Sequence, residues 1–473
     1  MRAIAPSIAQ IVLLAAALPA AAASGQEAND LDRIRSQIDA LAQRTIRTAP
    51  LAGLAIGVAR GDQILIAKGY GFADLENDVP VTEHTVFRLA SVTKQFTAAA
   101  VMQLVEEGAL SLEDPLARLW PEFPTGGRTV TLRQLLNHTS GIPSVTSLPE
   151  FESRSETIHS RDELLDLVKG QPFDFEPGQE FRYNNTGFIL AGEILGRACS
   201  KPYDHVIAER IFAPLGMSDS CYGWEQPILK RRAQGYRVVD GRLANDAVID
   251  MVIPGGAGAL ASSVVDLLKW ATAVQRCAIV GDASQAEMTA PTRLSDGVLV
   301  DYGFGLVTDR SRGQPRVAHG GNIQGFSTWL EWYPDLELSI AVLINTEGNG
   351  AQELAGRIAR LLVPAPAATR AGVAATPGLL ARCAGTFARG EQRLTLSVTG
   401  EGLSMQLGEQ PRSALQFLGE RDNLVEFQSA SSRGPRVVVV RDRRAVDHVT
   451  LVSELVAMRF RPVAREDAFK GSR

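Results

Sequence analysis

The sequence predicts an α+β protein in which a large unit with one antiparallel sheet precedes a small all-β unit. Strand-like segments occur near both ends of the first unit, and helical segments lie between and outside them. A Pro- and Ala-rich stretch then leads into a series of short strand-like segments. We expect terminal helices to pack on the sheet, a largely helical insert, and a groove where the insert meets the sheet.

The length and composition fit two folded units. The chain has 473 residues, of which 45% are hydrophobic and 21% charged, as in an ordinary folded protein. The net charge of −5 leaves no cationic excess with which to neutralise a phosphate backbone, so nucleic acid is excluded as a partner.

The cysteines give no sign of a metal or redox site. Their spacings fit neither a zinc pattern nor a Cys-x-x-Cys motif, so we expect no metal and no cofactor. A chain of this length does not need disulfides, and we expect four buried thiols, although Cys199 with Cys221 would be the most acceptable pair. The cysteines are Cys199, Cys221, Cys277 and Cys383.

The first 23 residues have the features of a secretory signal peptide. Arg2 precedes a short apolar core over residues 11–18, and a run of alanines offers a cleavage site before Ser24. Neither this core nor any later stretch is long and apolar enough to cross a bilayer. We therefore expect a secreted or periplasmic protein, with an uncleaved anchor as the alternative.

Hydrophobic periodicity predicts the elements of the first unit in order. A helix begins at Asp30, its expected N-cap, because apolar residues then recur on one face. A hairpin follows, with strands over 54–59 and 64–70. The segment 85–108 is predicted to be mostly one helix that ends at Gly108. The middle of the unit mixes helices with loops, and the final elements are strands over 316–319, 327–333 and 337–345 and a helix over 351–362.

The second unit is predicted from short strand-like runs that alternate with Gly-containing and charged turns. It is a small sandwich or barrel, and we find no catalytic motif in it. The runs cover residues 393–398, 403–407, 424–427, 437–440 and 449–451. The predicted organisation is a signal peptide over 1–23, a main domain over 24–362, a linker over 363–378 and a C-terminal β domain over 379–473.

The first motif that carries chemistry is Ser91-Val92-Thr93-Lys94. A Ser and a Lys three positions apart lie on one face of a helix, so the hydroxyl has an amine beside it that can act as a base. Backbone N–H groups at a helix N-terminus can also stabilise an oxyanion near Ser91. No other lysine of the sequence has a Ser three residues before it.

Two further motifs complete the set. In Tyr183-Asn184-Asn185 the phenol can relay a proton and an amide can hold a substrate carbonyl. In His319-Gly320-Gly321 the glycines, on an edge strand, would let a substrate carbonyl approach closely. The absence of His-Glu-x-x-His and of Gly-x-Ser-x-Gly counts against a zinc protease and an α/β-hydrolase.

Together these motifs resemble the active site of penicillin-recognising serine hydrolases, the group of class C β-lactamases, D-alanyl-D-alanine carboxypeptidases, D-aminopeptidases and related esterases. The resemblance covers about residues 30–362 and includes three further stretches. It implies a β-lactamase/transpeptidase-like domain, and residues 380–463 resemble the lipocalin-like barrel of many relatives. The further stretches are Leu135–Ile142, Gly255–Gly258 with Ser262 and Asp266, and Tyr302–Gly305.

The resemblance also implies roles for individual residues. Ser91 is the nucleophile, Lys94 and Tyr183 share the work of the general base in a proportion left open, and Tyr183 is the base in deacylation. Asn185 contacts the substrate amide or Lys94. The backbone N–H groups of Ser91 and Asn322 form the oxyanion hole. His319, Gly320 and Gly321 line the substrate site. We expect His138 to be a structural hydrogen-bonding residue and the loop over 144–160 to border the groove.

The third motif departs from the β-lactamase pattern, which usually has Lys-Thr-Gly or Lys-Ser-Gly. His319 is mostly neutral at pH 7 and Gly320 has no hydroxyl, so strong recognition of a penicillin carboxylate is not expected. We therefore favour an esterase or D-amino-acid peptidase that acts on a small-molecule or peptide substrate. The alternatives are a β-lactamase or penicillin-binding carboxypeptidase, an acyltransferase, and a non-catalytic binding protein on the same fold. The oligomeric state and the role of the β domain stay open.

Overall fold

The computed structural model describes residues 25–154, 157–223, 228–365, 374–400, 402–429, 434–442 and 445–463. The predicted signal peptide and residues 366–373 of the predicted linker lie outside these ranges. Among the helices within them, none has the length and hydropathy needed to cross a membrane.

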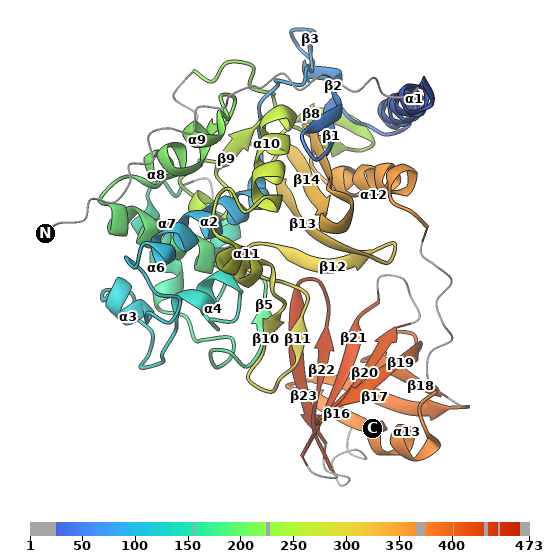
Figure 1. Cartoon of the computed structure of the whole chain (residues 1–473). Coiled ribbons are helices and arrows are strands. Elements are labelled where there is room, and N and C mark those ends of the chain that lie inside the picture. The colour runs from blue at the N-terminus through green and yellow to red at the C-terminus, as the bar shows by residue number, and fades with distance from the viewer. Residues whose placement is uncertain are drawn as a thin grey trace, which may run out of the picture.

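The first unit is built on an antiparallel seven-stranded sheet with the order β12-β13-β14-β15-β1-β2-β3. Because β15 pairs with β1, the two sequence ends of the unit meet in the middle of one sheet, as predicted (Figure 1). The strands are β1 (Gly53–Arg60), β2 (Gln63–Asp74), β3 (Val79–Pro80), β12 (Val307–Ser311), β13 (Gln314–Ile323), β14 (Phe326–Tyr333) and β15 (Leu338–Ile344).

Helices cover both faces of this sheet. α1 (Gly25–Thr48) and α12 (Gly350–Leu362) pack on one face, and α10 (Val264–Gln275) packs on the other. Every residue of β14 and β15 is therefore buried, in the pattern of a strand with no solvent-facing side. α1 begins at Gly25, so the prediction that it begins after an N-cap at Asp30 is wrong.

The segment predicted as one helix over 85–108 has three parts. β4 (Phe87–Arg88) comes first, a 3₁₀ turn over Ala90–Val92 follows, and α2 (Thr93–Glu106) begins only there. Ala90 has a φ of 48°, a left-handed conformation through which an α-helix of L-residues does not continue. Gly108, with a φ of 72°, follows the end of α2 as predicted.

The helical insert surrounds α2 and α7 (Figure 1). α7 spans Asn185–Cys199, and the helices around it and α2 are α3 (Leu116–Leu119), α4 (Leu132–Leu136), α5 (Pro149–Arg154), α6 (Arg161–Lys169), α8 (Tyr203–Ile207), α9 (Ala213–Leu215) and α11 (Asp282–Thr289). Short strands connect them: β5 (Phe181–Arg182), β6 (Cys221–Tyr222), β7 (Tyr236–Val239), β8 (Arg242–Asn245), β9 (Leu260–Ser262), β10 (Thr292–Arg293) and β11 (Leu299–Val300).

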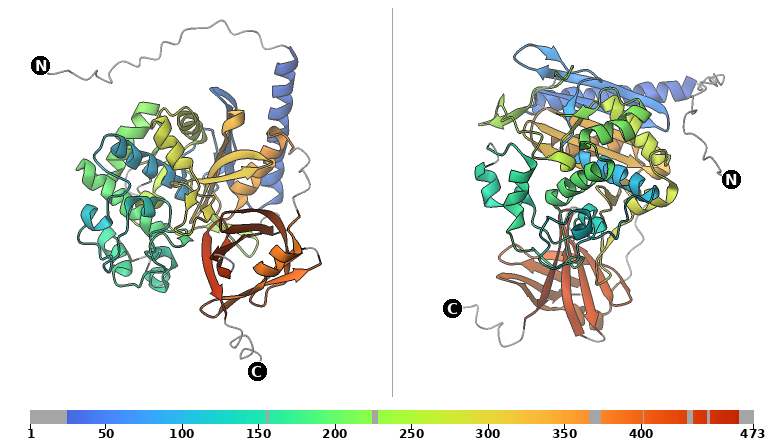
Figure 2. Two further views of the ribbon diagram at one scale, coloured as in Figure 1. Left: turned by 60° about the horizontal axis from the view of Figure 1, so that its bottom comes forward. Right: turned by 90° about the vertical axis from the view of Figure 1, so that its left-hand side faces the viewer.

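The second unit is a closed eight-stranded antiparallel barrel, visible as a ring in the left view of Figure 2. This confirms the barrel alternative. Three strands were not predicted, β16, β19 and β23, because their apolar residues are interrupted by polar ones and by glycine or proline, and few of their side chains are buried. α13 (Pro377–Cys383) precedes the barrel and packs into its core. The strands are β16 (Gly385–Arg389), β17 (Gln392–Thr399), β18 (Gly402–Leu407), β19 (Ser413–Arg421), β20 (Leu424–Ser429), β21 (Arg436–Asp442), β22 (Ala445–Val452) and β23 (Val456–Pro462).

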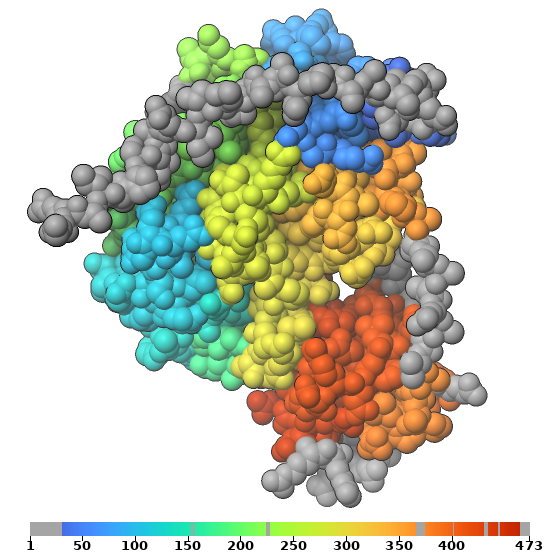
Figure 3. Space-filling model, viewed as in Figure 1, coloured from blue at the N-terminus to red at the C-terminus, as the bar shows by residue number. Residues whose placement is uncertain are grey.

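The barrel packs directly against the first unit, next to the segment that contains β10 and β11 (Figure 3). One end of β23 pairs with β16 to close the barrel, and its other end pairs with β5 of the first unit. An apolar cluster joins the outer face of the barrel to Phe181 and Tyr302. Ion pairs connect Arg389 with Glu180 and Arg459 with Asp296.

All four cysteines are free thiols. The expectation of four buried thiols is right only for Cys383, because Cys199, Cys221 and Cys277 are half-buried.

Candidate active site

Ser91 and Lys94 lie side by side at the start of α2. Ser91 is in the 3₁₀ turn and Lys94 is the second residue of the helix, with its Nζ 3.0 Å from Ser91 Oγ. Lys94 Nζ also donates to Asn185 Oδ1 at 2.8 Å and to the Ala257 carbonyl at 2.9 Å. The side chain is fully buried, and this burial holds the pKa of Lys94 well below its usual value.

These contacts determine what the amine can do. The Asn185 and Ala257 oxygens can only accept hydrogen bonds, so a neutral amine satisfies both with its two hydrogens. Its lone pair is then left for the hydroxyl hydrogen of Ser91. The arrangement can therefore remove a proton from Ser91, as a general base does.

Asn185 is held by contacts on three sides. It is the first residue of α7, whose N-cap Asn184 accepts a hydrogen bond from the Gly187 N–H at 2.8 Å. The Asn185 N–H donates to Ser144 Oγ at 3.1 Å, and its Nδ2 donates to Thr146 Oγ1 at 3.0 Å. Because Nδ2 is engaged there, the amide oxygen faces Lys94.

Tyr183 lies over the Lys94 amine, with its ring centroid 4.7 Å from Nζ. Its hydroxyl is buried and has no hydrogen bond of good geometry. Burial raises the pKa of Tyr183, and the nearby Ser91 hydroxyl lowers it less than burial raises it. The phenol therefore stays protonated at neutral pH, so this group can donate or relay a proton but is not a standing base.

The His-Gly-Gly motif lies on β13, beyond the residues that pair with β12, so this part of the strand is an unpaired edge. A Cβ at Gly321 would lie 2.3 Å from the Leu89 carbonyl oxygen, and one at Gly320 would lie 2.8 Å from the Trp329 ring. The glycines thus admit the protein's own backbone and an indole ring, and this differs from the expected approach of a substrate. They bring β13 against the turn that carries Ser91.

A groove opens in front of Ser91. Asn322, predicted to provide an oxyanion N–H, lines it together with Ser91 and Asn185. Thr146 and Phe151 confirm that the loop over 144–160 borders the groove. None of the described lining residues carries a charge. The other lining residues are Ala90, Ile189, Ile249, Ile253, Pro254, Ala257, Gly258, Ile323 and Gln324.

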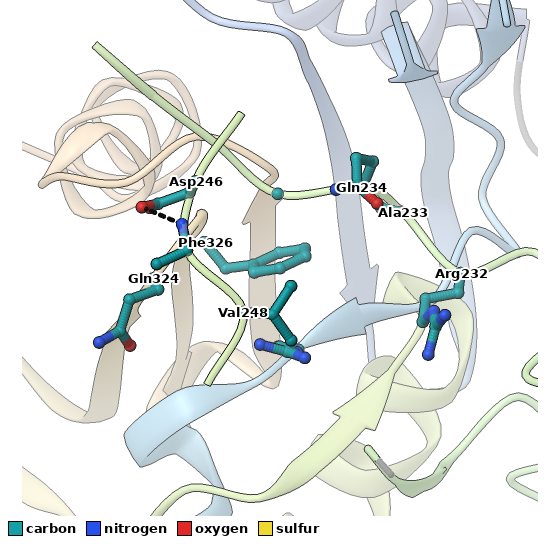
Figure 4. A pocket seen from close by; sticks show the side chains of 10 residues that line it. Arg232, Ala233, Gln234, Asp246, Val248, Gln324 and Phe326 are labelled. Atoms are coloured by element: carbon teal, nitrogen blue, oxygen red, sulfur yellow. Dashed lines mark hydrogen bonds between the residues drawn. The ribbon is translucent and has the colours of Figure 1, made fainter. Parts of the chain in front are cut away.

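A second pocket shares Gln324 with this groove and contains charged side chains (Figure 4). Arg88 and Arg232 lie in it, and Asp246 lies at its opposite end from Arg232. Burial and the neighbouring Arg232 charge lower the pKa of Arg88 to about 10. These charges belong to the side pocket and not to the groove in front of Ser91.

Behind Tyr183, two buried histidines meet at one buried tyrosine. The Tyr302 hydroxyl is 3.0 Å from His138 Nε2 and 3.0 Å from His319 Nε2. The expected structural hydrogen bonding of His138 is confirmed. His319 is buried and is absent from the groove lining.

Sequence reasoning assigned no role to Tyr302 or to the Ala257 carbonyl. Both belong to stretches that drew attention only as family-like, Tyr302–Gly305 and Gly255–Gly258. Groups of three His, Cys, Asp or Glu side chains arranged to hold a metal ion do not occur within the described ranges.

Comparisons with known proteins find one family and several relatives. A model of the family described as Beta-lactamase matches residues 38–365. Penicillin-binding protein 4* of Bacillus subtilis (strain 168) is 30% identical over 315 residues, 63% of this chain and 69% of that protein. D-aminopeptidase of Gluconobacter oxydans (strain 621H) is 26% identical over 317 residues, 66% of this chain but only 58% of that protein.

Solved structures are similar over most of the chain. The octameric penicillin-binding protein homologue from Pyrococcus abyssi has a TM-score of 0.61 and 25% identity, covering 91% of this chain and 100% of that one. The D-amino acid amidase from Ochrobactrum anthropi SV3, complexed with L-phenylalanine amide, has a TM-score of 0.61 and 26% identity, covering 70% of this chain and 98% of that one.

Proposed function

The chain belongs to the Beta-lactamase family, and from this membership we propose that it is a serine hydrolase that forms an acyl-enzyme on Ser91. One observation carries the proposal: the buried Lys94 amine has two obligate acceptors and one hydroxyl, Ser91, as partners. A neutral Lys94 in this position has its lone pair directed at the nucleophile.

In the acylation step, Ser91 Oγ attacks the substrate carbonyl carbon and its proton passes to Lys94 Nζ. The backbone N–H groups of Ser91 and Asn322 hold the oxyanion. When the bond to the leaving group breaks, that group takes the proton of the Tyr183 hydroxyl, and the Lys94 ammonium returns a proton to Tyr183. The products are the Ser91 ester and a neutral alcohol or amine.

Deacylation reverses these transfers with water in place of the leaving group. The water proton passes through Tyr183 to the neutral Lys94 amine as the water oxygen attacks the ester carbonyl. The bond between the acyl carbon and Ser91 Oγ then breaks, the Lys94 ammonium returns its proton to Ser91, and the free acid leaves. Because its pKa is raised, Tyr183 serves as a relay and Lys94 as the base, a division that the sequence leaves open.

The proposed substrate is an ester or an amide of a D-amino acid with an apolar acyl side. The described groove lining is uncharged and rich in isoleucine, and one structural relative is a D-amino acid amidase complexed with L-phenylalanine amide. A β-lactamase or carboxypeptidase would need a cation near Ser91 for the substrate carboxylate. Export through the predicted signal peptide is part of this proposal.

Intact-mass measurement tests the nucleophile. The mature protein is incubated separately with p-nitrophenyl butyrate, D-phenylalanine amide and benzylpenicillin, beside Ser91→Ala and the control Ser397→Ala on the barrel strand β17. We expect turnover of the ester or the amide that is lost only in Ser91→Ala, and no lasting penicillin adduct. A stable penicillin adduct on Ser91 would favour a penicillin-binding peptidase. Transfer of the acyl group to an added alcohol in preference to water would favour an acyltransferase. No Ser91-dependent reaction would refute the hydrolase.

A further inference from the structure

A continuous chain of hydrogen bonds connects the second and third sequence motifs behind the groove. At one end the Asn184 N–H lies 3.2 Å from His138 Nδ1. The two histidines then meet at the Tyr302 hydroxyl, each through its Nε2 at 3.0 Å. At the other end His319 Nδ1 is 2.6 Å from the Gly320 carbonyl oxygen.

The two ends of the chain determine the position of every proton in it. A backbone N–H can only donate, so His138 Nδ1 is an acceptor and the ring hydrogen is on Nε2. A carbonyl oxygen can only accept, so His319 Nδ1 carries the hydrogen and Nε2 is an acceptor. Tyr302 accepts from His138 and donates its one hydrogen to His319. Both ends thus require the same direction of donation, and the two histidines have opposite neutral tautomers.

The chain does not accommodate a charged His319. With both ring nitrogens protonated, Tyr302 would receive N–H groups from both histidines, and its own hydrogen would lose its acceptor in a buried place. Burial first, and then the nearby Lys94 amine in its protonated form, lower the pKa of His319 to about 3. The same two effects hold the pKa of His138 well below its ordinary value.

We propose that Tyr302 is a specificity-determining positioning residue, which donates to His319 Nε2 and so keeps the neutral ring in the tautomer with no N–H left for a substrate, and that the site therefore selects substrates without a carboxylate next to the scissile bond. The substrate class rests on the proposed function above, whereas the tautomers do not. His319 is therefore a support for the edge of β13 and not an anion-binding residue.

The surroundings of Tyr302 keep this arrangement in place. Its ring belongs to the apolar cluster between β10–β11 and the outer face of the barrel, and it also contacts the rings of Phe181 and Tyr183. The packing of the Tyr302 ring therefore fixes the direction of its hydroxyl. Removal of the hydroxyl alone leaves the packing of the ring intact. The uncharged lining of the groove agrees with selection of neutral substrates.

Nuclear magnetic resonance of the protein labelled with ¹⁵N at its histidines tests the tautomers without any need for activity. We expect His138 and His319 at neutral pH to show one protonated and one unprotonated nitrogen each, with the hydrogen on Nε2 in His138 and on Nδ1 in His319. His138→Asn and His319→Asn identify the signals by their loss. An imidazolium, or an Nε2–H tautomer, at His319 would overturn the proposal.

A matched substrate pair tests the specificity. N-benzoyl-D-alanyl-D-lactate and its neutral lactamide differ only in the charge beside the scissile ester. We expect the wild-type protein to prefer the lactamide by about tenfold in kcat/KM. Tyr302→Phe removes the hydrogen that His319 Nε2 accepts, so the neutral ring is no longer held in one tautomer and one orientation. We expect the preference to fall at least about threefold and the His319 signals to change.

Tyr70→Phe is the control, because Tyr70 also loses a hydroxyl bonded to another side chain, Asp39, on the far side of the sheet. It should leave the preference unchanged. Wild-type preference for the lactate, or an unchanged preference in Tyr302→Phe, would overturn the proposal. If neither ester is cleaved, the proposed function and the substrate class fail together, and the ¹⁵N measurement still decides the tautomers.

Discussion

Substitution of Gly321 by alanine should separate β13 from the turn that carries Ser91. The new Cβ would lie 2.3 Å from the Leu89 oxygen, whereas ordinary contact begins at 3.4 Å, so β13 and the turn must move apart by about 1.1 Å. The Thr328 hydroxyl, 2.5 Å away, blocks escape in another direction. A displacement of about 1 Å at a catalytic site costs on the order of 100-fold in kcat, or about 2.7 kcal/mol.

The assay compares kcat, KM and urea denaturation of Gly321→Ala with those of Gly356→Ala. No atom lies within 4 Å of a Cβ built at Gly356, which is inside α12, so this control should keep its activity and gain up to about 1 kcal/mol in stability. Gly321→Ala should lose kcat with little change in KM and lose about 1–3 kcal/mol of stability. A kcat within about threefold of wild type would refute the reasoning, because the strand would then not need its close approach.

Three further predictions follow from single contacts. Because burial lowers the Lys94 pKa and only the unprotonated amine accepts a proton, kcat/KM should rise with pH through the lowered pKa of Lys94 and then reach a plateau; a kcat/KM that falls as Lys94 deprotonates would argue against Lys94 as the base. Arg389→Ala leaves the mostly buried Glu180 without its cation and should lower the free energy of unfolding by about 3 kcal/mol, whereas the exposed Arg393→Ala should change it by less than about 0.5 kcal/mol. Thr328→Val removes the hydrogen bond to the Leu89 carbonyl and should cost about 1–2 kcal/mol in urea denaturation; an unchanged midpoint would show that this hydrogen bond adds nothing to stability.

Local periodicity was sufficient to predict most of the sheet. The strands β1, β2, β14 and β15 and the helix α12 have continuous or regularly spaced apolar residues, so their places along the chain follow from side-chain pattern alone. The start of α2 did not follow, because the backbone turns left-handed at Ala90, a residue type that gives no signal for such a turn.

The parts of the site whose residues lie close together in the sequence were predictable, and the parts that come from distant segments were not. The Ser91–Lys94 spacing brings the two groups together even though Ser91 precedes the helix. The meeting of His138, Tyr302 and His319 depends on how three distant segments pack, and no spacing in the sequence reports it. The need for a glycine at position 321 was likewise not predictable, because the close contact there is with Leu89, more than two hundred residues earlier.

The barrel and Tyr183 are connected through the short strand β5. β5 has only two residues, too few to hold an isolated strand in place, and it gains its pairing from β23. The Tyr183 N–H, immediately after β5, donates to the Leu455 carbonyl at 2.9 Å in the turn that precedes β23. On the other side, the Asn184 cap begins α7. The backbone of Tyr183 is therefore fixed between the barrel and the N-terminus of α7. One strand, β23, both closes the barrel and supports the segment that places the phenol over Lys94.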